Sequence, residues 1–172
     1  VFSLLDVDIP FLIDPSSLPL VRSLQVGGRL CQPVQLLLPQ LDSLNLKHMR
    51  RIADVNASIQ QSTSITSLSI HKNYIASVNE ASRTTIKERI SEFRLQVMGA
   101  DYIGDSTLTS ILAGSKVMKK VILDGFYLSV SDQGRHKFLE TLKVFKDACR
   151  KKNIELWKEN FEVGNGKVDL EK

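Results

Sequence analysis

The chain has 172 residues, of which 42% are hydrophobic and 24% charged, a composition that excludes a wholly disordered protein. Its length suffices for a single domain with a core of its own. The formal net charge of +4 is mildly basic, which permits contact with acidic partners but does not by itself indicate nucleic-acid binding.

Cysteine usage and hydropathy bear on where the protein works. Cys31 and Cys149 are far apart and neither belongs to a CxxC pair, so we expect no disulfide framework and a reducing compartment, cytoplasmic or nuclear. The sequence lacks an apolar stretch of about 18 residues, so no membrane contact is expected. Residues 1–17 are apolar but broken by aspartates, and without a basic start they predict an irregular N-terminal segment rather than a signal peptide.

A short pattern, apolar-x-x-apolar-x-apolar, recurs along the chain. It occurs at 21–26, 41–46, 65–70 and 118–123, in a weaker copy at 92–97 with Glu92 in the first apolar slot, and in a frayed form at 151–156. The middle apolar positions of the first five copies, 24, 44, 68, 95 and 121, are separated by 20, 24, 27 and 26 residues. We therefore interpret 18–130 as repeats of one supersecondary unit. The longer last step of 33 residues suits an irregular terminal cap within 131–172.

Each copy has the spacing of a short strand with one apolar face. Its last two apolar residues are two positions apart, so they lie on the same face. The residue between them lies on the opposite face, and it is polar in all the main copies except the fifth, which has Ile122; the polar residues are Gln25, Asn45, Ser69 and Gln96. Stacked in parallel, such strands would bury a continuous core.

Helical signals alternate with these strands. Residues 26–39, rich in glycine and proline, predict an irregular connection. Helical spacing is then seen for Met49, Ile52, Val55 and Ile59. A second turn, started by Thr84 or Thr85, is expected to carry Ile86 and Ile90.

Two further helices are predicted in the second half. The first is capped by Asp105 or Ser106, ends at Gly114 and carries Leu108, Ile111 and Leu112. The second follows Ser131-Asp132, ends in a basic turn and carries Phe138, Leu139, Leu142, Phe145 and Cys149. The alternation of strand and helix predicts an α/β solenoid of five to six irregular repeats.

The third copy resembles the leucine-rich repeat, whose consensus is L-x-x-L-x-L-x-x-N/C-x-L. It reads Ile65-x-x-Leu68-x-Ile70-x-x-Asn73-x-Ile75. The resemblance implies that the Asn73 side chain bonds the backbone where the chain leaves the strand. The other copies have different residues in that slot, namely Arg29, Met49, Ala100 and Phe126, so a continuous asparagine ladder is not expected.

Irregular repeats of this kind resemble those of F-box substrate receptors of ubiquitin ligases, over roughly residues 18–157. The stretch 139–156 resembles the closing helix and strand of such domains. The resemblance implies protein–protein recognition, with the adaptor subunit of an SCF-type ligase bound through a region outside this chain. No F-box of the LPxEIL kind is present, and one would have to lie upstream of Val1.

Catalytic and cofactor motifs are weak or missing. No GxxxxGK[ST], GxGxxG or HExxH occurs, so we expect neither an enzyme nor a cofactor or metal. Gly27-Gly28 is interpreted as a turn rather than a phosphate loop, and the histidines His48 and His71 as rim residues rather than a metal pair. The other weak signals, which we read as solvated or chance features, are the aspartates at 6, 8 and 14, the Asn56 sequon and the basic run 143–152.

The predicted partner site is the polar face of the strands together with the residues just beyond them. Its residues are Arg22, Gln25, Asn45, His48, His71, Lys72, Arg94, Gln96 and Lys119. The positive bias of this set would favour an acidic or phosphorylated protein partner. The alternatives are a repeat segment of an immune or regulatory receptor, a small α/β enzyme, and a nucleic-acid-binding domain. A further alternative is that this stretch is only the scaffold of a longer solenoid.

Overall fold

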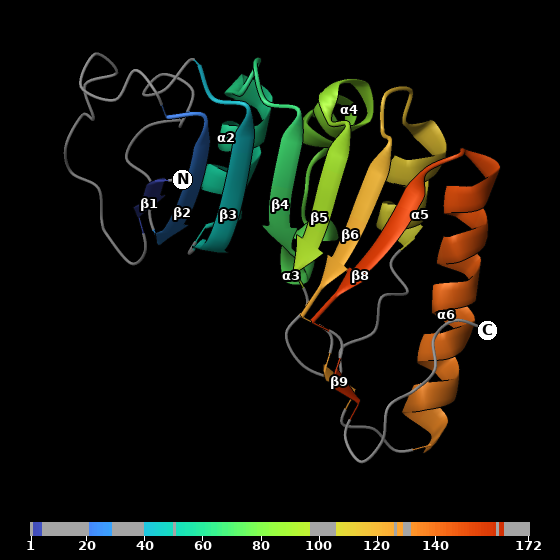
Figure 1. The fold of residues 1–172 in the computed structure, drawn as a ribbon. Coiled ribbons are helices and arrows are strands. Elements are labelled where there is room, and N and C mark those ends of the chain that lie inside the picture. Colours follow the sequence, from blue (N-terminus) through green and yellow to red (C-terminus); the bar gives the residue numbers. More distant parts are fainter. Residues whose placement is uncertain are drawn as a thin grey trace.

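The computed structural model describes residues 2–4, 21–28, 40–49, 51–96, 106–125, 127–128, 132–160 and 162–163. Over these ranges the protein is α/β, with a seven-stranded sheet in which every neighbouring pair is parallel (Figure 1). The strand order follows the chain order: β1 (Phe2–Leu4), β2 (Ser23–Gly28), β3 (Ser43–Met49), β4 (Ser67–His71), β5 (Glu92–Gln96), β6 (Lys120–Asp124) and β8 (Glu155–Glu159).

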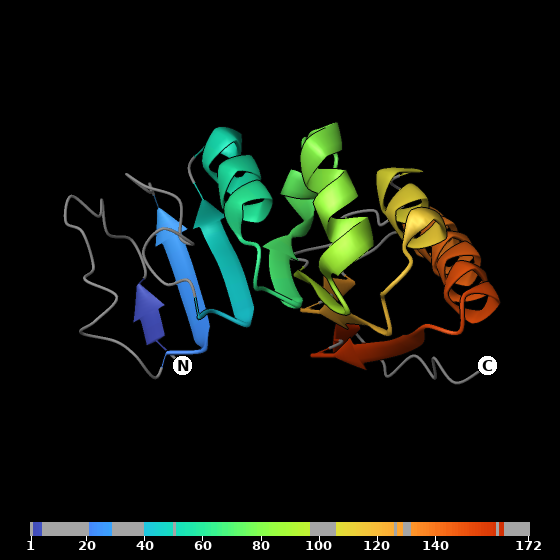
Figure 2. The same ribbon diagram turned by 90° about the horizontal axis from the view of Figure 1, so that it is seen from above.

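The helices lie side by side against one face of this sheet (Figure 2). They are α2 (Ile52–Gln61), the single turn α3 (Lys72–Ile75), α4 (Glu80–Arg89), α5 (Ser106–Gly114) and α6 (Asp132–Lys151). No helix in the described ranges covers the other face, which we call the open face. Among the same residues, none of the helices is both long and apolar enough to cross a bilayer.

The strand pairing brings the repeated apolar residues into level rows. One row runs from Phe2 through Leu24, Leu44, Leu68, Phe93 and Val121 to Leu156. The next row contains Val26, Leu46, Ile70, Leu95 and Leu123, and all five are at most 1% exposed. The strand face predicted from copies one, two, three and five is therefore confirmed. From Leu24 to Val121 these rows lie in the core between the sheet and the helices, and Leu156 packs against it partly buried.

The strand predicted for the fourth copy is present as β5 with the expected face buried, but its alignment with the neighbouring copies is wrong by two residues. Phe93, not Leu95, is level with Leu68, and Ile90 fills the first apolar slot. Because strand side chains alternate with a period of two, a shift of two residues keeps the same face buried, and the pattern alone does not distinguish the two alignments. The sixth copy is displaced in the same way, since Leu156 is level with Val121 and Trp157 with Ile122.

The N-terminal part of the chain is more regular than expected. The structure adds β1 within 1–17, where the sequence predicted no element, and extends β2 to Gly28. Gly27 and Gly28 therefore belong to a strand and not to a turn or a phosphate loop. The rest of the predicted connection, 29–39, lies outside the described residues.

The helices predicted in the second half of the chain agree better with the structure than those predicted in the first half. The helix over 106–114 is confirmed, and Leu108, Ile111 and Leu112 are buried. Helix α4 begins earlier than expected, because Asn79 caps it by accepting a hydrogen bond from the Ser82 amide at 2.9 Å. Thr84 and Thr85 therefore lie inside the helix. In α2, Val55 and Ile59 are buried as predicted, whereas Met49 belongs to β3.

Helix α6 ends in a Schellman motif. The Ile154 amide donates to the Cys149 carbonyl at 2.9 Å and the Asn153 amide donates to the Arg150 carbonyl at 3.1 Å. Asn153 has the required left-handed backbone, with φ of 55°. The helix itself was predicted, and its described apolar face (Leu142, Phe145 and Cys149) is buried.

The alignment of β5 can be tested by truncating Phe93, which is fully buried. Phe93→Ala should lower the free energy of unfolding by about 3–5 kcal/mol, since it removes a large core side chain and leaves a cavity. Val144→Ala, at a position that is 59% exposed on α6, is the control and should change it by less than about 0.5 kcal/mol. Urea titration followed by circular dichroism measures both, and equal effects would contradict the alignment.

Burial raises the pKa of the Cys149 thiol from 9.0 to about 11. The unfolded chain therefore loses this proton at lower pH than the folded one, and stability should fall as pH rises from about 9 to about 11. Cys149→Ala should remove up to about 2 kcal/mol of that decline. The free energy of unfolding of both proteins is measured across this pH range. Parallel curves would contradict the prediction, because they would show that the thiol has the same pKa in the folded and unfolded states.

Candidate partner-binding face

The open face carries the residues that alternate with the core rows. One row of level positions consists of Gln25, Asn45, Ser69, Arg94, Ile122 and Trp157. The rows on either side contain Ser67, Glu92, Lys120 and Glu155, and His71, Gln96, Asp124 and Glu159. The parallel pairing therefore brings residues that are far apart in sequence into one plane.

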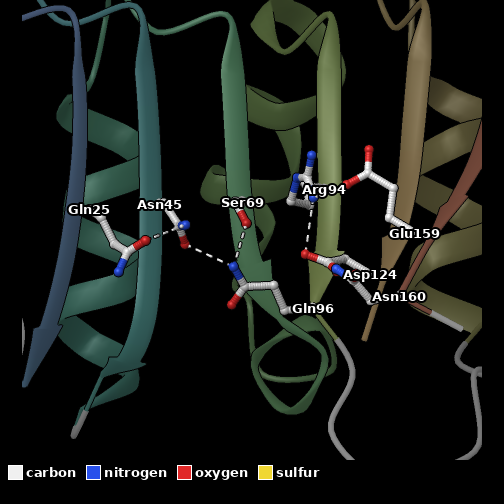
Figure 3. Close-up of polar contacts among 8 residues, drawn as sticks. All are labelled: Gln25, Asn45, Ser69, Arg94, Gln96, Asp124, Glu159 and Asn160. Carbon is white, nitrogen blue, oxygen red and sulfur yellow. Dashed lines mark hydrogen bonds and ion pairs between the residues drawn. The ribbon is translucent and has the colours of Figure 1, made fainter. Parts of the chain in front are cut away.

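An amide ladder crosses strands β2 to β5 (Figure 3). The side chain of Asn45 donates to Gln25 Oε1 at 3.1 Å. Gln96 Nε2 donates to Asn45 Oδ1 at 3.1 Å and to Ser69 Oγ at 2.9 Å. These half-buried side chains hold one another in place, so this part of the open face is an ordered, uncharged surface of donors and acceptors.

An ion cluster ties β5, β6 and β8 together at the other end of the face (Figure 3). Arg94 Nη1 lies 3.0 Å from Asp124 Oδ2 and 2.7 Å from Glu159 Oε2. Asn160 adds a hydrogen bond of 2.7 Å to the second oxygen of Asp124. Burial alone would lower the pKa of Arg94, but its hydrogen bonds to Glu159 and Asp124 outweigh burial and raise that pKa.

Beside this cluster, Trp157 stands on β8 with 49% of its surface exposed. The ammonium group of Lys120 lies 3.9 Å from the centre of the indole ring and 3.6 Å from a Glu92 carboxylate oxygen. The indole N–H donates to Glu155 Oε2 at 3.1 Å. These contacts orient the ring on the open face. Ile122, which is level with Arg94 and Trp157 and lies between them, is only 1% exposed although it lies on the open face.

The charge of this face differs from the expectation. On β5, β6 and β8, the two outward cations Arg94 and Lys120 lie among four carboxylates: Glu92, Asp124, Glu155 and Glu159. The positive bias predicted from the sequence is therefore wrong for this half of the face. The carboxylates were missed because the expected set sampled only some of the outward positions of each strand.

The predicted site residues fall into three groups. Gln25, Asn45, Arg94 and Gln96 lie together on the open face, in the ladder and the ion cluster. Two others lie where strands begin and are exposed, namely Arg22, whose guanidinium donates to the Gln40 carbonyl at 3.1 Å, and Lys119. The third group lies at or beyond the ends of strands and comprises His48, His71 and Lys72.

At the end of β4, the structure gives His71 a capping role and leaves the expected backbone bond of the repeat to Tyr74 instead of Asn73. His71 Nδ1 accepts a hydrogen bond from the Asn73 amide at 3.2 Å and so caps α3. Asn73 itself is exposed, and the bond back to the preceding repeat comes from Tyr74, whose hydroxyl donates to the Met49 carbonyl at 2.7 Å. Burial raises the pKa of Tyr74 although this hydrogen bond opposes the rise. The side chain of His48 lies outside the described residues, so the pairing with His71 is not placed.

Sequence reasoning missed Trp157, Asp124 and Glu159. Trp157 and Glu159 were missed because the final repeat was aligned two residues too early, so its predicted strand ended at Leu156 and did not include them. A usable signal was present: Glu155, Trp157 and Glu159 alternate along one strand, and this is the only tryptophan in the chain.

The weaker sequence signals occupy other places. Asn56 accepts a hydrogen bond from the Asn79 amide at 3.0 Å, and Ser58 of the same sequon is buried, so the sequon lies in the contact between α2 and α4. Of the basic residues in the run 143–152, Lys143, Arg150, Lys151 and Lys152 are exposed along α6 and its end, and Lys146 is half-buried. Among the described residues, no group of three histidine, cysteine or acidic side chains could hold a metal ion. The aspartates at 6, 8 and 14 lie outside these residues.

Comparison with protein-family models, curated proteins and solved structures finds no match to the chain. What is established is therefore the class of fold, an α/β protein whose main parallel sheet has strands that alternate with helices along the chain.

The ion cluster predicts an unequal response to substitution. Arg94→Ala should lower the free energy of unfolding by about 1–3 kcal/mol, because it leaves two partly buried carboxylates close together without their cation. Adding Asp124→Asn and Glu159→Gln to Arg94→Ala should recover part of that loss, since the uncompensated charges are removed. Thermal melts measure both variants, and a triple variant that is less stable than Arg94→Ala would contradict this account.

Proposed function

We propose that this chain is a solenoid of the leucine-rich-repeat type that recognises a protein partner on its open face. Three features of the described residues support the solenoid: strands of the main sheet in chain order, parallel pairing between all of them, and helices on one face of that sheet only. Each strand then pairs with the strands next to it in the chain order, as in stacked repeats. The spacing of the level positions from Leu24 to Val121, which is 20, 24, 25 and 28 residues, also falls in the range of such repeats.

The observation that carries the recognition proposal is the pre-ordered polar surface of the open face. From β2 to β8, side chains on the face are held by hydrogen bonds and ion pairs to one another. A surface whose rotamers are already restrained loses less entropy when a partner binds. Arginine and tryptophan, the residue types enriched at binding hot spots, are both on it.

The finer proposal is that the chain is the substrate-recognition part of an SCF-type ubiquitin-ligase receptor. Its support is the resemblance of the irregular repeats and of the closing helix and strand to those of F-box receptors. The longest gene product that contains this chain should then recover the SCF adaptor and a cullin from a cell lysate, as read by mass spectrometry. Partners recovered without the adaptor would leave the recognition scaffold in place and remove the ligase proposal.

Use of the open face is tested by placing a bulky cation in the middle of the amide ladder. Asn45→Arg should reduce recovery of the bound proteins at least about tenfold, because the side chain projects into the proposed interface. Val144→Arg adds the same charge on the helical side, where Val144 is 59% exposed, and should leave recovery unchanged. The measurement is quantitative capture with melting curves as the folding check, and the reverse pattern would assign the partner to the helices instead.

A further inference from the structure

We propose that the partner presents a basic, arginine-containing segment, and that its guanidinium group stacks on Trp157 and pairs with Glu155. This inference rests on the proposed function and specifies the chemistry of the partner. The surface concerned is the Trp157 patch, which we define as Glu92, Lys120, Glu155 and Trp157 together with the adjoining carboxylates Asp124 and Glu159.

The first argument is the exposure of the indole. The apolar residues of the sheet are nearly all buried, whereas Trp157 keeps 49% of its surface open on an edge strand. An indole held partly open to water offers apolar area that a partner can cover, and aromatic rings contribute much of the energy of protein interfaces. Tryptophan is also the residue type most enriched among binding hot spots.

The second argument is that the ring is already set for a cation. Lys120 lies over it at 3.9 Å from the ring centre, which shows that a cation is accommodated at the ring. The hydrogen bond from the indole N–H to Glu155 holds a carboxylate beside the ring edge. A planar guanidinium group can stack on an aromatic ring and pair with a carboxylate at the same time, which a lysine ammonium does less well.

The third argument is the balance of charge. Four carboxylates and two cations leave an excess of two negative charges on the outward side of β5, β6 and β8. This local excess is opposite in sign to the net charge of the whole chain, which is +4. A basic segment would be attracted to this patch, whereas an acidic or phosphorylated segment would meet like charge at close range.

The single tryptophan of the chain makes a direct test possible, because its fluorescence reports on this patch alone. The probes are three ten-residue peptides of alternating composition: arginine and serine, lysine and serine, and glutamate and serine. We expect the arginine peptide to give a saturable fluorescence change that weakens with salt, the lysine peptide to bind at least about threefold more weakly, and the glutamate peptide to give no change. Equal or stronger binding of the glutamate peptide would overturn the proposal.

Two variants decide whether the binding is at the patch. Glu155→Gln keeps the fluorophore and should weaken the arginine peptide about tenfold, and Trp157→Ala, measured by calorimetry, should weaken it about 30-fold or abolish binding. Both positions are exposed, and melting curves check that the fold is kept. Lys143→Gln on the exposed side of α6 is the control and should leave binding unchanged. Affinity that is the same in both variants as in the unaltered chain would overturn the proposal.

Failure here is distinguishable from failure of the proposed function. If Asn45→Arg abolishes capture of the cellular partners while Trp157→Ala and Glu155→Gln retain them, the open face is used but the basic-segment inference is wrong. If all three variants retain the partners, both proposals fail. If all three lose them and the arginine peptide binds as described, both are supported.

Discussion

The parallel, in-register pairing of the strands is the constraint on which the rest of this structure depends. Parallel neighbours lie roughly 4.8 Å apart, and level positions along the sheet place one residue of each repeat beside its counterpart in the next. Burial of the row from Leu24 to Val121 therefore determines what lies on the other face. The amide ladder, the ion cluster and the exposed tryptophan all lie one residue away from a buried row.

Much of the fold follows from patterns that are visible in the sequence. The repeated apolar triplet identified five of the strands, and the apolar faces of α5 and α6 were read from helical spacing. The errors have a common physical origin. A two-residue displacement leaves strand burial unchanged, so Phe93 and Leu156 were misaligned even though their faces were correct. The start of α4 was misplaced because Asn79, a strong cap, precedes it in a stretch with little apolar periodicity.

The candidate site was predictable only in part, because its properties arise from pairing between strands. Gln25, Asn45 and Gln96 were recognisable as outward polar residues, but the ladder that joins them spans four repeats and depends on the alignment of each. From the sequence alone, Arg94 counted toward a positive charge on this face. Its neutralisation by Asp124 and Glu159, which lie 30 and 65 residues further along the chain, follows only once β5, β6 and β8 are placed side by side.

The ends of β6 and β8 have a consequence for the course of the chain. Gly125 and Asn160 both have a left-handed backbone, with φ of 77° and 51°, and the Gly125 amide donates to the Glu159 carbonyl at 3.1 Å. Each is followed by a short strand, β7 (Tyr127–Leu128) and β9 (Glu162–Val163), and these two pair in parallel as a separate sheet. Both turns take the same number of residues, since Asp124 pairs with Glu159 and Tyr127 with Glu162. The pairing of β6 with β8 therefore continues in the same register into that of β7 with β9, and a one-residue insertion in either turn would shift β7 relative to β9.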